Sequence, residues 1–147
     1  MKQSKQSKPK LLFLVHCEEM FRAKFPSHNF PSKLRRACRD YDRAIALTSM
    51  IDIEGAIPEI KDVTEEWEWS WGYEPESFDK QERKHVIPAY GHEWTWVPPE
   101  LRGHKLREIK KWSVFVGGGY ESECLQDFLD VLDHVGVDYT KVRELIY

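Results

Sequence analysis

A single cysteine follows a run of glycines in the last third of the sequence, and this arrangement has the clearest capacity for covalent chemistry. Gly117, Gly118 and Gly119 separate an apolar segment that ends at Val116 from Cys124. Glycines let a backbone approach a ligand closely. A cysteine in the first turn of a helix lies near amides whose partial charge favours a thiolate and can stabilise an oxyanion. The spacing therefore indicates a cysteine nucleophile.

The same residues also have an interpretation without chemistry. A lone cysteine at the start of a helix is commonly a small buried residue, and three glycines can simply form a tight turn. Cys17 and Cys38 are far from Cys124 in the sequence, and no pair has the C-x-x-C spacing. A disulfide framework or a zinc ribbon is therefore not expected.

Polar residues also border apolar runs elsewhere in the chain. His16 follows the run Leu11–Val15, and Lys84 lies in a second polar stretch. Because sites in open parallel sheets gather beyond the carboxyl ends of the strands, we expect these residues and Cys124 to form one site. The residues expected to bind substrate there are Glu18, Glu19, Gly118, Gly119, Tyr120, Tyr90 and Trp94. For the two glutamates, a solvated loop is the alternative.

Three of these segments together resemble the isochorismatase-like cysteine hydrolases, which include nicotinamidases and carbamoylsarcosine amidases. LVHCEEMF (14–21) resembles the end of the family's first strand, with His16 in the place of an aspartate. KHVIPAY (84–90) resembles its Lys-x-x-x-Ser-Ala-Phe pattern. VFVGG (114–118), followed by Cys124, resembles its strand-glycine-cysteine motif, including the glycine six residues before the cysteine.

The resemblance implies hydrolysis of a small amide or other C–N bonded substrate. Cys124 would be the nucleophile and Lys84 its electrostatic partner, while His16 stands at the position of the base. Histidine can serve as the base for a cysteine, and Glu18 or Glu19 could supply the missing carboxylate. Two hypotheses stay open: a rearranged hydrolase, or an inactive fold that binds a ligand or a protein. Because family members often form dimers or tetramers, a homo-oligomer is expected.

The metal site of nicotinamidases has no evident equivalent here. In those enzymes an aspartate after the second strand is closely followed by a histidine, whereas no histidine follows Asp52 closely. His85, His92 and His104 lack a compact ligand spacing. The sequence therefore predicts no metal and no other cofactor.

The pattern of apolar runs predicts an α/β fold, a three-layer sandwich with a mostly parallel central sheet flanked by helices. Residues 1–10 are expected to form a disordered basic tail, and 11–147 a single domain with a Trp-rich insertion near 64–97. The predicted strands cover 11–17, 44–50, 112–116 and 137–142. The predicted helices cover 32–43, 57–66, 98–111 and 121–134.

Alternating tryptophans in the insertion indicate a half-buried strand or an extended arm. They are Trp67, Trp69 and Trp71, followed later by Trp94 and Trp96. Such side chains either pack in the core or form a surface for a protein partner.

Charge and hydropathy narrow the remaining classes of function. The net charge of −3, without a long basic face, does not favour nucleic-acid binding. The apolar runs are too short to cross a bilayer, and no signal peptide is evident, so we expect a cytoplasmic protein.

Overall fold

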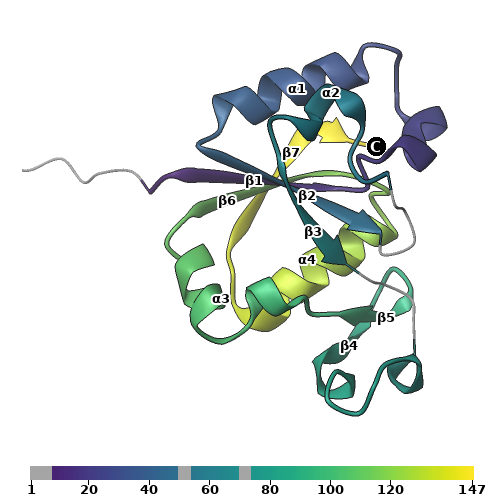
Figure 1. Ribbon diagram of the computed structural model, residues 1–147, viewed down its shortest axis with the longest axis vertical. Coiled ribbons are helices and arrows are strands. Elements are labelled where there is room, and N and C mark those ends of the chain that lie inside the picture. Colours follow the sequence, from purple (N-terminus) through teal and green to yellow (C-terminus); the bar gives the residue numbers. More distant parts are fainter. Residues whose placement is uncertain (1–7, 50–53, 70–73) are drawn as a thin grey trace, which may run out of the picture.

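The computed structural model describes residues 8–49, 54–69 and 74–147 and has an α/β fold (Figure 1). Within these residues, five strands form the central sheet in the order β3-β2-β1-β6-β7, and all neighbouring strands are parallel. The strands are β1 (Lys10–Val15), β2 (Arg43–Ser49), β3 (Glu65–Trp69), β6 (Ser113–Gly118) and β7 (Tyr139–Ile146). Because helices cover both faces, the predicted three-layer fold is confirmed.

The helices form the two outer layers (Figure 1). Helices α1 (Phe30–Asp40) and α2 (Pro58–Lys61) cover one face, and α3 (Gly103–Ile109) and α4 (Cys124–Val135) cover the other. Short 3-10 helices in the described part of the chain connect the elements: η1 (Glu19–Lys24), η2 (Pro75–Ser77), η3 (Arg83–His85) and η4 (Pro99–Leu101). None of the described helices is long and apolar enough to cross a membrane.

Two of the predicted helices are shorter in the structure. The helix predicted over 57–66 is limited to α2, because the chain then pairs with β2 as strand β3. The helix predicted over 98–111 is divided into η4 and α3, because Arg102 between them is extended (φ −126°, ψ 147°). At the N-terminus, Lys8–Lys10 is ordered, since the carbonyl of Pro9 accepts from the amide of Ser113.

Strand β1 lies at the centre of the sheet because its side chains are buried on both faces. Leu11, Phe13 and Val15 contact the core on the side of α3 and α4, whereas Leu12 and Leu14 contact the core on the side of α1 and α2. All five side chains are fully buried. This explains why the run is continuously apolar instead of alternating.

The order of the strands places a topological switch point between β1 and β6. The chain runs outward from β1 through β2 to β3, then crosses to β6 on the other side of β1 and continues to β7. Loops after β1 and β6 therefore leave in opposite directions, which is where open α/β sheets bind ligands. Here the backbones are close: a Cβ at Gly118 (φ +102°) would lie 2.1 Å from the carbonyl oxygen of Val15.

Residues 74–97 contain a hairpin outside the central sheet. Strands β4 (Val86–Ala89) and β5 (Glu93–Trp96) pair antiparallel, and the hairpin lies beside α4 (Figure 1). The insertion predicted near 64–97 begins later than expected, because Glu65–Trp69 is a strand of the central sheet. Parallel pairing joins residues that are far apart in the sequence, so the residues near a strand do not identify its partner. The alternating tryptophans therefore did not distinguish β3 from the hairpin strand β5.

Most of the tryptophans of this region belong to the core. Trp67, Trp69 and Trp96 are buried and Trp94 is half-buried, while Trp71 lies outside the described residues. The side chains of Trp67, Trp69 and Trp96 therefore stabilise the hairpin and the sheet.

Candidate functional site

The turn after β1 places two polar side chains in the interior. His16 Nδ1 lies 2.7 Å from a carboxylate oxygen of Glu18, and both side chains are fully buried. The His16 ring stacks on Phe21, with 4.5 Å between ring centres, and its backbone carbonyl accepts from the hydroxyl of Tyr147 at 2.5 Å. The left-handed backbone of His16 (φ 54°) makes the sharp turn that directs Glu18 back toward the ring.

This environment keeps His16 neutral. Burial lowers the pKa of His16 to about 3, and the neighbouring imidazole of His92 contributes to the same shift. An imidazole with so low a pKa is a weak proton acceptor at neutral pH. The surroundings of His16 therefore differ from those that a catalytic base requires.

Cys124 is the first residue of α4 and is only 4% exposed. Burial raises the pKa of its thiol to about 12, and the charges of Asp127 and Glu123 raise it further, while the amides of Tyr120 and Cys124 act in the opposite direction. The resting side chain is consequently a protonated thiol. At this end of the helix, the amides of Glu123 and Leu125 both donate to the carbonyl oxygen of Tyr120 (3.1 and 3.0 Å), so they are not available to an oxyanion.

Asp127, one turn along α4 from Cys124, is a fully buried carboxylate that the sequence analysis did not identify. One of its oxygens accepts from the amides of Gly91 and His92 (2.8 and 3.1 Å), and the other lies 2.5 Å from His92 Nδ1. The second ring nitrogen of His92, Nε2, lies 3.8 Å from a carboxylate oxygen of Glu123. Burial raises the pKa of Asp127, and the hydrogen bonds from the hairpin oppose that shift.

Cys124 and Asp127 lie within one turn of each other on α4, and the hairpin turn brings His92 to Asp127. Asp127 contacts His92 directly, and its charge acts on the thiol of Cys124. His92 also lowers the pKa of His16, which connects this group to the end of β1. We refer to the following six residues together as the Cys124 site: His16, Glu18, His92, Tyr120, Cys124 and Asp127.

The sequence does contain a feature that indicates Asp127: an acidic residue within the apolar stripe of α4. The buried stripe of α4 includes Leu125, Phe128, Leu129 and Leu132, and an acid at position 127 interrupts it three residues after the cysteine. A charged residue on the inner face of a helix is rarely buried without a partner. That signal identifies Asp127 but not its partner His92. His92 lies 35 residues earlier in the sequence, and the hairpin turn brings it to Asp127.

Several predicted residues do gather at this edge of the sheet. The ring of Tyr120 lies 5.8 Å from that of Phe21 and 5.5 Å from that of Tyr147. Gly119 packs so closely on Tyr147 that a Cβ there would lie 2.6 Å from the ring. Burial raises the pKa of Tyr147, and charges at Cys17, Tyr120, Cys124 and Glu18 raise it further. Tyr147 therefore packs among the residues of the site.

Other predicted residues lie elsewhere. Lys84 is exposed on η3, before β4, whereas the hairpin turn that contacts α4 follows β4. Glu19 pairs with Arg22, which also binds Glu59 at 2.7 Å. Two further predicted residues are on the hairpin: Tyr90 is 91% exposed at the turn, and Trp94 is half-buried on β5.

Within the described ranges, no group of three or more His, Cys, Asp and Glu side chains has an arrangement that could hold a metal ion. Asp52, at the position where the resemblance would place a metal ligand, lies outside these ranges.

Searches of protein-family models, curated proteins and solved structures found no match to this chain.

Proposed function

We propose that this chain is a cysteine hydrolase that cleaves a small amide or another C–N bonded substrate. The observation that supports this proposal is the position of Asp127, which contacts His92 and acts on the thiol of Cys124. A nucleophile, a base and a group that orients the base are the parts that covalent hydrolysis needs. The site lies between β1 and β6, where α/β sheets bind ligands.

In the proposed reaction, the sulfur of Cys124 attacks the substrate carbon while its proton passes to Nε2 of His92. The hydrogen bond from Nδ1 of His92 to Asp127 orients the ring and stabilises its protonated form. The C–N bond then breaks, and the leaving amine takes the proton from His92. Water attacks the resulting thioester with His92 again as base, and the released sulfur recovers that proton.

This assignment differs from the roles that the resemblance implies. His92 takes the part first given to His16, because the pKa of His16, at about 3, is too low for a base. Asp127 supplies the carboxylate that the family carries after its first strand. The exposed Lys84 has no part in the proposed steps.

Replacement of Cys124 by serine tests the proposal. With a panel of small primary amides and ureas, and ammonia release as the measurement, Cys124→Ser should reduce turnover on the order of 10³-fold or more. Cys38→Ser is the matched control, because Cys38 is as buried as Cys124 but lies on α1, on the opposite face of the sheet; its turnover should stay within about threefold of wild type. Full activity in Cys124→Ser would refute the mechanism.

A second candidate function is a non-catalytic protein that binds a ligand at the same edge of the sheet. It is favoured by the high pKa of Cys124 and by the amides of Glu123 and Leu125, which are already bonded to Tyr120. Iodoacetamide at pH 7, followed by peptide mass spectrometry, separates the two. Faster alkylation of Cys124 than of Cys17 supports the hydrolase. If neither cysteine is alkylated and no amide is turned over, the binding protein is supported.

A further inference from the structure

The position of the β4–β5 hairpin decides where His92 lies. Among the described residues, the hairpin pairs with no strand of the central sheet. Because a lone two-stranded hairpin is marginally stable in water, contacts with other elements must hold it. At its turn, the amide of Tyr90 donates to Asp130 at 2.8 Å, and the amides of Gly91 and His92 donate to Asp127. The turn is therefore attached to α4.

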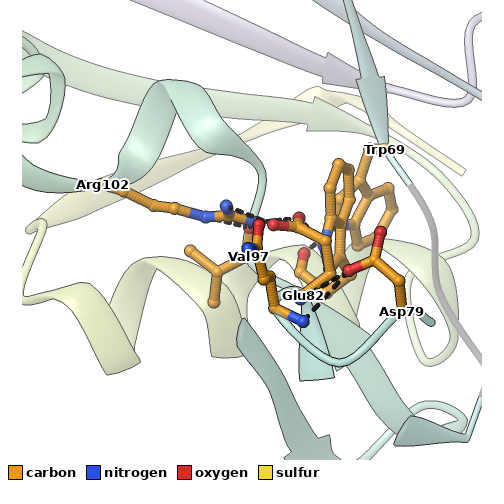
Figure 2. Close-up of polar contacts among 7 residues, drawn as sticks. Trp69, Asp79, Glu82, Val97 and Arg102 are labelled. Carbon is orange, nitrogen blue, oxygen red and sulfur yellow. Dashed lines mark hydrogen bonds and ion pairs between the residues drawn. The ribbon is translucent and has the colours of Figure 1, made fainter. Parts of the chain in front are cut away.

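A second polar cluster holds the open end of the hairpin, and Figure 2 shows it. Arg102 donates to the carbonyl oxygen of Val97 at 2.6 Å and to both carboxylate oxygens of Glu82 at 2.9 and 3.2 Å. The indole of Trp96 donates to the same carboxylate at 3.0 Å. The guanidinium also lies 5.4 Å from the centre of the Trp96 ring, within the range of a cation–π interaction.

Trp96 connects this cluster to the Cys124 site. Its carbonyl oxygen accepts from the indole of Trp69, the last residue of β3, at 3.0 Å (Figure 2). The ring of Trp69 lies 6.0 Å from that of His16 and 5.6 Å from that of Phe128 on α4. Phe78 stacks on Trp96 with 6.0 Å between ring centres. The hairpin, β3 and α4 therefore share one group of packed rings.

We infer that Glu82 and Arg102 are positioning residues for the Cys124 site. They hold Trp96 and the open end of the hairpin against β3, and the short β4–β5 ladder then keeps His92 in contact with Asp127. The pair is partly buried, with Arg102 20% and Glu82 30% exposed, so solvent screens it less than a pair on an open surface. Only the catalytic consequence of this inference rests on the proposed function.

Amide hydrogen exchange of Glu82→Gln tests the inference directly. Glutamine keeps an oxygen that can accept from Trp96 but removes the charge that pairs with Arg102. The amides of Tyr90, Gly91 and His92 should exchange about tenfold faster than in wild type, because the turn leaves α4 more often. Amides of β1 should stay within about twofold, since the central sheet does not depend on this pair.

Glu65→Gln is the matched control. Glu65 binds Arg43 through both oxygens (2.5 and 2.8 Å), and the guanidinium of Arg43 lies 5.6 Å from the Trp112 ring, so the same groups occur at the amino ends of β2 and β3. This variant should leave the three turn amides unchanged. Equal exchange in Glu82→Gln and wild type would overturn the inference. Equal acceleration of the turn and β1 amides would overturn it too, since that pattern indicates a general loss of stability.

Steady-state kinetics give the catalytic test. If Cys124→Ser loses activity, Glu82→Gln should lower kcat about tenfold with KM within about threefold, because a displaced His92 impairs the chemical step more than binding. An unchanged kcat would contradict the positioning of His92. If Cys124→Ser keeps its activity, the proposed function fails, but the exchange measurement still decides whether the ion pair positions the hairpin.

Discussion

At the scale of single residues, Asp127 has two opposing effects on the Cys124 site. Its carboxylate orients His92 through a 2.5 Å contact, and its charge raises the pKa of Cys124. The first effect assists a base, and the second opposes a thiolate. The site therefore suits a mechanism in which the proton leaves the sulfur during attack, and not one that begins from a stable thiolate.

Asp127→Asn should separate the two effects. Loss of the negative charge lowers the pKa of Cys124, so its alkylation by iodoacetamide at pH 8 should become about threefold faster or more. Turnover of an amide substrate should fall, because His92 loses its charged partner. Peptide mass spectrometry measures the alkylation of Cys124, and ammonia release measures turnover.

Asp130→Asn is the control for that experiment. Asp130 accepts from the same hairpin turn through the amide of Tyr90, but its charge is not among those that raise the pKa of Cys124. Its alkylation rate should match that of wild type. If Asp127→Asn alkylates no faster than Asp130→Asn, the charge of Asp127 does not govern the thiol.

At the scale of the elements, the site depends on close contact between the hairpin turn and the first turn of α4. A Cβ at Gly91 would lie 2.2 Å from the carbonyl oxygen of Glu123 and 2.5 Å from a carboxylate oxygen of Asp127. Only glycine permits this approach, because any side chain would force the two elements apart. The contact between the hairpin turn and α4 therefore requires glycine at position 91 in addition to the hydrogen bonds to Asp127.

Gly91→Ala should weaken this contact and destabilise the protein. We expect a loss of about 1–3 kcal/mol in the free energy of unfolding, measured with urea, since the added methyl group displaces the turn from α4. Tyr90→Ala, at the 91% exposed neighbouring position, should change it by no more than about 0.5 kcal/mol. Equal losses in the two variants would mean that the turn does not rest on α4.

The elements themselves were more predictable than their contacts. The continuous apolar run 11–15 and the spacing of Leu125, Phe128 and Leu132 predict β1 and α4 because burial leaves a periodic trace in the sequence. No such periodic pattern indicates that β3 pairs with β2, because this pairing joins residues far apart in the chain, such as Ile45 and Glu65.

The same limit applies to the site. His16 and Cys124 were placed at one edge of the sheet, because the carboxyl ends of parallel strands lie together. The contact of His92 with Asp127 requires the hairpin to fold back onto α4, which depends on tertiary packing and not on local pattern. For the same reason, motif spacing could not show that Lys84 is exposed before β4.

At the scale of the whole molecule, the buried polar residues after β1 link the site to the stability of the fold. His16 and Glu18 are fully buried, where apolar side chains would cost less to bury. Burial holds His16 as a neutral imidazole, while the Glu18 carboxylate and the ring of Phe21 fix its orientation. Protonation of His16 would place a charge in the interior, so the stability of the folded chain depends on pH.

The direction of this dependence follows from the pKa of His16, which falls from 6.5 to about 3 on folding. Above pH 6.5 neither state binds a proton at His16, and its contribution is constant. Below pH 6.5 the unfolded chain binds a proton that the folded chain does not, so the free energy of unfolding falls by up to about 1.4 kcal/mol per pH unit until the pH nears 3.

Urea unfolding at pH 7.5, 5.5 and 4.5 should therefore show a steeper loss of unfolding free energy in wild type than in His16→Gln, whose glutamine does not titrate. The exposed His104→Gln should retain the wild-type loss, and parallel losses in wild type and His16→Gln would mean that His16 is not held neutral in the folded chain.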